Sequence, residues 1–162
     1  MILIKTIIFT FIVPGAVTII VPYWLLSCSA PPALPFGLFR YVGLLPVFIG
    51  IAILLRCVWD FTFAGKGTPA PIDPPKELVV QGLYRYVRNP MYIGILSILL
   101  GEALLFASWR LFGYAAIVFC LFFLFVLFYE EPVLKKRFDE SYREYCKNVP
   151  RWIPRRLKRF KE

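Results

Sequence analysis

Long apolar runs dominate this sequence and constrain its fold more than any other feature. The mean hydropathy is +0.69, and 59% of the 162 residues are hydrophobic, which lies outside the range of soluble domains. Inside a bilayer the backbone has to satisfy its own hydrogen bonds, so spanning segments without sheet partners must be helices. We therefore expect an all-α integral membrane protein that forms a single membrane-embedded domain over residues 1–162.

Four apolar segments predict four transmembrane helices, over residues 2–27, 36–64, 91–107 and 111–129. The first contains Pro14 and Gly15, which predict a kink, and its apolar run is longer than that of a signal peptide. We therefore favour a retained span over a cleaved signal. A proline-rich loop should occupy residues 65–90, and the tail over residues 130–162 has the pattern of an amphipathic helix on the membrane surface. The tail pattern fits a simple tether and a share in a functional site equally well.

The distribution of charge predicts the orientation. Of the 19 lysines and arginines, 15 lie in the proline-rich loop and the tail, whereas the opposite face has only Arg40 and Arg110. The positive-inside rule then places both termini, the loop and any site beside them on the cytoplasmic side. A basic tail next to a span contacts lipid headgroups, so the expected partner is the bilayer and not nucleic acid.

Residue types that are missing or scattered exclude several kinds of chemistry. The chain has no histidine, which removes the commonest general base and the commonest metal ligand. The four cysteines show no CxxC spacing, so free thiols are expected and no metal site is predicted; they are Cys28, Cys57, Cys120 and Cys146.

Polar side chains gather at the ends of the two last apolar runs. Asn89 followed by Pro90 reads as a helix N-cap with proline at the first helical position. Glu130 and Glu131 close the next run, after a tight turn expected at Ser108–Arg110. If these runs form a hairpin, the asparagine and the glutamates meet at one membrane face.

Two glutamates at the C-terminal end of a helix oppose the helix dipole, so a cation should offset them. Lys135, Lys136 and Arg88 could supply it as structural salt bridges. A cationic ligand is the alternative, and S-adenosyl-L-methionine fits the pattern. Its ammonium and sulfonium suit the glutamates, its carboxylate suits the helix start at Asn89 and Pro90, and its adenine suits tyrosines such as Tyr84 and Tyr92.

Two other ionisable features lie within the expected spans. Arg56 and Asp60 are spaced i,i+4 and predict a structural ion pair near the interface, with a site role in second place. Glu102 lies within reach of Arg110 and the far interface, which favours a structural role.

The segment Gly82–Gly94, GLYRYVRNPMYIG, resembles the G-x-Y-x-x-x-R-H-P-x-Y-x-G signature of the isoprenylcysteine carboxyl methyltransferase family. EEPVLKKRFDESYREYCKNVP resembles the family's second signature, E-E-x-x-L-x-x-x-F-G-x-x-Y-x-x-Y-x-x-x-V-P. The likeness covers residues 76–154. Asn89 replaces the family histidine, Asp139 replaces a glycine on what should be an exposed helix, and Val126 stands where eukaryotic members have an arginine.

The resemblance implies a membrane-embedded methyltransferase that uses S-adenosyl-L-methionine and a lipophilic acceptor such as an isoprenylcysteine-type carboxylate, a thiol or a lipid. The cofactor contacts that it implies fall on Leu78, Val79, Tyr84, Asn89, Pro90, Met91, Tyr92 and Glu130. A carboxylate or thiolate acceptor needs no base, whereas an amine would need one, for which Glu131 and Tyr142 are the candidate catalytic residues. An NADPH-dependent sterol-type reductase and a non-catalytic membrane adaptor are the alternative functions.

Overall fold

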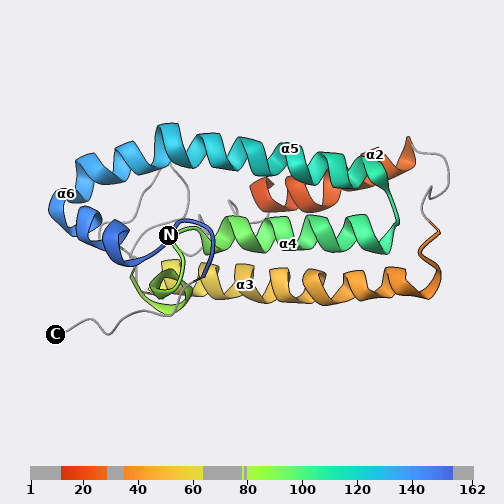
Figure 1. Cartoon of the computed structure of the whole chain (residues 1–162), viewed down its shortest axis with the longest axis horizontal. Coiled ribbons are helices and arrows are strands. Elements are labelled where there is room, and N and C mark those ends of the chain that lie inside the picture. Colours follow the sequence, from red (N-terminus) through yellow and green to blue (C-terminus); the bar gives the residue numbers. More distant parts are fainter. Residues whose placement is uncertain (1–11, 29–34, 64–77, 79, 155–162) are drawn as a thin grey trace.

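The computed structural model describes residues 12–28, 35–63, 78 and 80–154 (Figure 1). Within these ranges the chain is helical without any strand, which confirms the all-α class. Two helices are long and apolar enough to cross a membrane, Gly37–Asp60 and Trp109–Asn148. Two more apolar helices are shorter, Ile12–Ser27 and Pro90–Leu105. Large apolar side chains such as Leu38 and Phe128 are exposed along them, as expected of a surface that faces lipid.

The N-terminal helix is irregular in its middle. A π turn, η1 (Ala16–Ile20), precedes α2 (Val21–Ser27), and the Val21 N–H donates to the carbonyl of Ala16, five residues back. Pro22 follows directly and has no N–H to donate, and its ring would clash with the carbonyl four residues earlier in a regular helix. The irregularity expected at Pro14 and Gly15 therefore begins just after them and lies next to Pro22.

Glycines bring the next two helices close together. The 3₁₀ segment η2 (Gly37–Gly43) leads into α3 (Leu44–Phe63), close to the span predicted over residues 36–64. α4 (Pro90–Leu105) packs antiparallel to it: a Cβ on Gly50 would lie 2.5 Å from the Gly94 carbonyl oxygen, and one on Gly101 would lie 2.6 Å from that of Gly43. Both contacts require backbone against backbone, the packing that small residues permit inside membranes.

The turn between α4 and α5 (Trp109–Phe125) comes slightly earlier than the predicted Ser108–Arg110. It is formed by Phe106, Ala107 and Ser108, where the Ser108 N–H donates to the Ala103 carbonyl and Ala107 has a φ of 50°. A residue in the left-handed region is the usual way to end a helix, and it leaves Trp109 free to start the next one. The hairpin of two apolar helices is confirmed.

The prediction that a helix ends at the paired glutamates is wrong. α5 continues through a π turn, η4 (Val126–Glu130), into α6 (Glu131–Asn148), so both glutamates lie inside one long helix. The Glu131 N–H donates to the carbonyl of Val126, and Pro132 follows, as Pro22 follows η1. The proline changes the hydrogen-bond register without ending the helix, because the π turn moves its ring away from the preceding carbonyl.

α6 breaks at Asp139, whose backbone angles are φ 39° and ψ −112°. Figure 1 shows the end of α6 turning back beside the end of the bundle. This reversal buries Tyr142, Tyr145 and Val149 in a cluster with Leu78 and Val80, which stand just before the 3₁₀ turn η3 (Gly82–Arg85). The tail thus packs against the loop that leads into α4.

Candidate functional site

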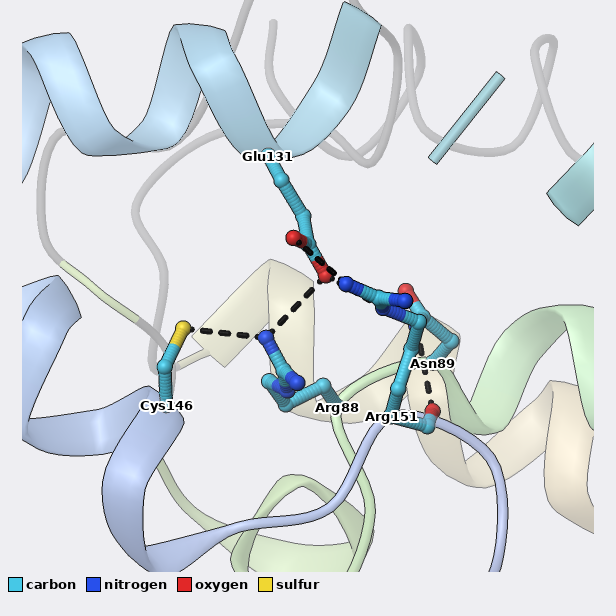
Figure 2. A network of polar contacts seen from close by, with 5 residues as sticks. All are labelled: Arg88, Asn89, Glu131, Cys146 and Arg151. Atoms are coloured by element: carbon cyan, nitrogen blue, oxygen red, sulfur yellow. Dashed lines mark hydrogen bonds and ion pairs between the residues drawn. The ribbon is translucent and has the colours of Figure 1, made fainter. Parts of the chain in front are cut away.

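Glu131 lies at the centre of a buried ion-pair cluster (Figure 2). The Arg151 guanidinium forms a bidentate ion pair with the Glu131 carboxylate, with Nε 2.7 Å from Oε1 and Nη2 2.9 Å from Oε2. Arg88 Nη1 donates to the same Oε1 at 3.0 Å. The Glu131 side chain is only 5% exposed, so these charge-assisted bonds stabilise a carboxylate that would be costly to bury alone.

The segment Val149–Pro154, which we call the C-terminal strap, crosses the start of α4. The backbone N–H of Arg88 donates to the Pro150 carbonyl at 2.9 Å, and Asn89 Nδ2 donates to the Arg151 carbonyl at 3.1 Å. These two bonds tie the strap to the first signature segment, and the Arg151 guanidinium ties it to Glu131 in the second. Figure 2 shows Arg88, Asn89 and Arg151 gathered below Glu131.

The prediction that the Asn89 side chain caps α4 is wrong. The helix does begin at Pro90, but no side-chain hydrogen bond caps it, because the amide of Asn89 is directed to the strap. The N–H groups of Met91 and Tyr92 in the first turn therefore have no intrahelical acceptor and no cap from the described residues. The helix start remains a place where backbone donors and the positive end of the dipole coincide.

Glu130 has a different environment from its neighbour. The Tyr92 hydroxyl donates to its Oε2 at 2.8 Å, and no other hydrogen bond or ion pair to this carboxylate occurs within the described ranges of the chain. Lys135 and Lys136, which the sequence offered as partners, are exposed and form no ion pair with it. One of the two adjacent carboxylates is thus neutralised by arginines, and the other is not.

The other residues predicted to contact the cofactor differ in their burial and in their contacts. Tyr84 is buried beside Cys57, with its hydroxyl hydrogen-bonded to that thiol, and Met91 packs against the pair. Pro90 is buried at the helix start, and Leu78 packs against the tyrosines of α6. Val79 lies outside the described residues.

Tyr142, a candidate base from the sequence, is 3% exposed and packs in the cluster with Tyr145 and Val149. Burial raises the pKa of Tyr142 and that of Tyr145 well above the usual range of a phenol. The Tyr145 hydroxyl remains a donor, at 2.7 Å from the Tyr84 carbonyl oxygen. The hydrogen bond to Glu131 raises the pKa of Arg151, which keeps this guanidinium charged. These groups serve as fixed donors at neutral pH.

Two contributors to the site, Arg151 and Cys146, were not predicted from the sequence, and a third, Trp152, lies in the tail for which a share in the site was left open. Arg151 comes from the strap, and Cys146 from the last turns of α6 accepts a hydrogen bond from Arg88 Nη1 at 3.0 Å. Trp152 packs its indole against Tyr92, Phe119 and Phe123, with ring centroids 5.6 to 6.5 Å away. Charge was the one sequence signal that could have pointed to Arg151. Two adjacent glutamates need cations, and the nearest lysines, Lys135 and Lys136, are exposed on the same helix.

The secondary candidates lie away from this cluster. Arg56 and Asp60 form the predicted i,i+4 ion pair, with Nη2 3.3 Å from Oδ1. Glu102 has a buried Oε2 that finds no hydrogen-bond partner in the described part of the chain, while Arg110 donates to the Cys28 carbonyl at 2.8 Å. All four cysteines are free thiols, as predicted.

The chain is similar to known proteins over the segments that build this site. Residues 38–141 of this chain match the sequence profile of the phospholipid methyltransferase family. A curated relative, protein-S-isoprenylcysteine O-methyltransferase of Schizosaccharomyces pombe (strain 972 / ATCC 24843), is 40% identical over 80 residues. The alignment covers 48% of this chain but 33% of the relative. No solved structure matches the chain. Since the family profile covers more than half of the sequence and contains both glutamates and the start of α4, the chain belongs to the phospholipid methyltransferase family.

Proposed function

We propose that this protein transfers a methyl group from S-adenosyl-L-methionine to a lipophilic acceptor at the cytoplasmic face of a membrane. The observation that carries the proposal is the environment of Glu130. Its carboxylate is held by Tyr92 but is not paired with a cation in the described part of the chain, although Glu131 beside it takes two arginines. An unpaired carboxylate in a mostly apolar site suits a ligand that carries positive charge.

The residues present fit both poles of S-adenosyl-L-methionine. When bound, the cofactor supplies an electrophilic methyl group on a sulfonium. Glu130 would bind the cationic end through the oxygen that Tyr92 leaves unoccupied. The uncapped N–H groups of Met91 and Tyr92 would bind its carboxylate at the start of α4. Asn89 and Pro90 set the position of this helix start, and Leu78 and Val79 would flank the cofactor from the loop.

The buried residues around this site would hold the ligand-binding residues in position without touching the ligand themselves. Tyr84 is enclosed beside Cys57, so we assign it to supporting the start of α4 rather than to stacking on adenine. Glu131 is occupied by Arg88 and Arg151, and protonating it would cost both ion pairs. Its proposed role is to keep the strap closed over the site and water out of it, instead of acting as a base. Tyr142 would hold α6 in place.

The acceptor classes that remain are a carboxylate, a thiol and a phospholipid amine. The S. pombe relative is named for an O-methyltransferase that acts on isoprenylcysteine. We favour a carboxylate for this chain because Glu131 and Tyr142 are both poorly suited to deprotonate an amine. A carboxylate attacks as an anion, so catalysis would consist of aligning it with the methyl group in a dry cavity.

The membrane arrangement is part of the proposal. We place four spans at residues 2–27, 36–64, 91–107 and 111–129, with both termini and the site on the cytoplasmic side. Support comes from two helices long enough to span and two shorter apolar ones. Residues 1–162 would then act as one membrane-embedded domain.

Glu130→Gln and Glu131→Gln test the assignment, since the two adjacent glutamates have different partners. Glu130→Gln should weaken binding of S-adenosyl-L-methionine by ~10 to 100-fold, the loss of one charged hydrogen bond of roughly 1.5–3 kcal/mol. It should leave the melting temperature of the ligand-free protein unchanged or slightly higher, because it removes a partly buried charge that no cation pairs in the described part of the chain. Glu131→Gln should lower the melting temperature, since breaking a buried ion pair costs roughly 3 kcal/mol or more.

Calorimetry in detergent gives the affinity, and thermal unfolding of the same samples gives the stability. NADPH serves as the competing ligand in the binding assay. Binding of NADPH but not of S-adenosyl-L-methionine would favour a reductase, and binding of neither would favour an adaptor. Unchanged cofactor affinity in Glu130→Gln with a lowered melting temperature would show that Glu130 serves the fold alone.

A further inference from the structure

We propose that Trp152 positions the methyl acceptor, by donating its indole N–H to one oxygen of the acceptor's carboxylate. This inference rests on the proposed function and adds a residue and a substrate feature to it. The starting observation is that Nε1 of Trp152, a half-buried residue, is itself buried and finds no hydrogen-bond partner among the described residues. A buried N–H without an acceptor is destabilising, and the N–H of a buried tryptophan usually finds a partner.

The strap holds this indole in a fixed place. Arg151, the preceding residue, is anchored through its guanidinium to Glu131 and through its carbonyl to Asn89. Pro150 accepts the backbone N–H of Arg88. With both preceding residues bound, the backbone of Trp152 has little freedom to bring the N–H to another acceptor, and the donor is preorganised for a ligand.

The ring contacts both a residue of the proposed cofactor site and residues of the apolar helix α5. It packs on Tyr92, with centroids 6.5 Å apart, and the hydroxyl of Tyr92 binds Glu130. It also packs on Phe119 and Phe123 of α5, with centroids 5.6 and 6.4 Å away. Phe119 is 43% exposed. An acceptor whose apolar tail lies along α5 could therefore bring its polar end to Trp152 next to the transferable methyl group.

The chemistry of the donor selects the acceptor. An indole N–H needs a lone pair, which a carboxylate offers and an ammonium does not. The N–H would bind the oxygen that does not react, because donating to the attacking oxygen would withdraw charge from the nucleophile. As the attacking oxygen bonds to the methyl carbon, the methyl–sulfur bond breaks, sulfur keeps the electron pair and the carboxylate becomes a neutral ester. No proton is transferred.

Trp152→Phe keeps an aromatic ring and removes the N–H. With N-acetyl-S-farnesylcysteine as acceptor, we expect KM to rise about 10-fold, kcat to change less than about twofold, and cofactor affinity to stay the same. A bond made equally in the ground and transition states appears in KM alone. Trp109→Phe is the matched control, since Trp109 is 65% exposed at the far end of α5 and its substitution should leave all three constants unchanged.

A binding readout tests the same bond without turnover. The chain has four tryptophans, so protein labelled with ¹⁵N-tryptophan in detergent should give four indole resonances, of which Trp152→Phe identifies one. N-acetyl-S-farnesylcysteine should move the Trp152 indole proton downfield, and farnesyl monophosphate should move it less. An unmoved Trp152 resonance, a larger shift with the phosphate, or a wild-type KM in Trp152→Phe would each overturn the proposal. Failure of the protein to bind S-adenosyl-L-methionine would instead overturn the proposed function, and the indole titration would still report on Trp152.

Discussion

At the scale of single residues, two adjacent glutamates have opposite environments. Glu131 is enclosed and bound by Arg88 and Arg151, so its charge belongs to the fold. Glu130 meets only the Tyr92 hydroxyl among the described residues, so its charge is available to a ligand. The contrast arises because the strap reaches the side of the helix on which Glu131 lies. Cofactor affinity and fold stability should therefore respond to different members of the pair.

Asp139 provides a second prediction at this scale. It stands at the position of the family glycine, and its φ of 39° with ψ of −112° is a conformation in which a side chain is strained. The sequence suggested a mild change on an exposed helix, whereas the residue lies at the break in α6. Its exposed ion pair with Arg143, at 3.5 Å, contributes little. Asp139→Gly should stabilise the protein by about 1 kcal/mol, because relief of roughly 1–2 kcal/mol of strain exceeds the entropic cost of glycine.

Thermal unfolding in detergent measures this change, with an expected rise of about 2–4 °C. Glu140→Gly is the control, because the next residue is helical and exposed, and glycine there should lower the melting temperature. If both substitutions lower it equally, Asp139 is not strained.

At the scale of elements, prolines and glycines determine how the helices run and pack. The π turns η1 and η4 each end two residues before a proline, Pro22 and Pro132 respectively. An extra residue in a turn rotates the following helix by about 100° relative to a regular continuation. In η4 this rotation falls at the two glutamates, and it sets which side of the long helix turns Glu131 toward the strap. The helix thus continues from the apolar α5 into the polar α6, and its buried side is rotated at η4.

The contact between α3 and α4 gives the prediction for this scale. Gly50→Ala places a Cβ 2.5 Å from the Gly94 carbonyl oxygen and 2.7 Å from the Ile98 side chain, so the helices must move apart. We expect a loss of about 1–3 kcal/mol, measured as a lower melting temperature and lower cofactor affinity, since α4 carries the site. Gly113→Ala in α5 is the control, because a Cβ there meets nothing within 4 Å and alanine favours the helix. Equal stability of the two variants would show that the glycine contact is unimportant.

At the scale of the whole molecule, three segments that are distant in sequence meet at one end of the bundle (Figure 1): the start of α4, the start of α6 and the strap. The hairpin of α4 and α5 brings the first two together, and the break at Asp139 returns the third. If the bundle spans a membrane as proposed, this end holds most of the positive charge and faces the cytoplasm.

Cysteine accessibility tests this orientation. Ala70, Lys158 and Pro32 lie outside the described residues, and each is replaced singly by cysteine in a background where the exposed Cys28 and Cys120 are serine. A membrane-impermeant thiol reagent should label positions 70 and 158 from the cytoplasmic side and position 32 from the opposite side. Labelling of positions 70 and 32 from the same side would rule out the four-span arrangement.

The sequence by itself determined the helices and the pair of segments that make the site. Apolar runs specify helices in a membrane because the requirement for backbone hydrogen bonds is local, and Pro90 marks the start of α4 because its missing N–H is harmless there. Only the tertiary structure decided that Arg151 neutralises Glu131, that Asn89 binds the strap instead of capping its helix, and that Tyr142 is buried. These contacts join residues 20 to 62 positions apart, and they exist because α6 reverses at Asp139. Neither helical periodicity nor charge spacing predicts that reversal, since both describe only residues within a few turns of one helix.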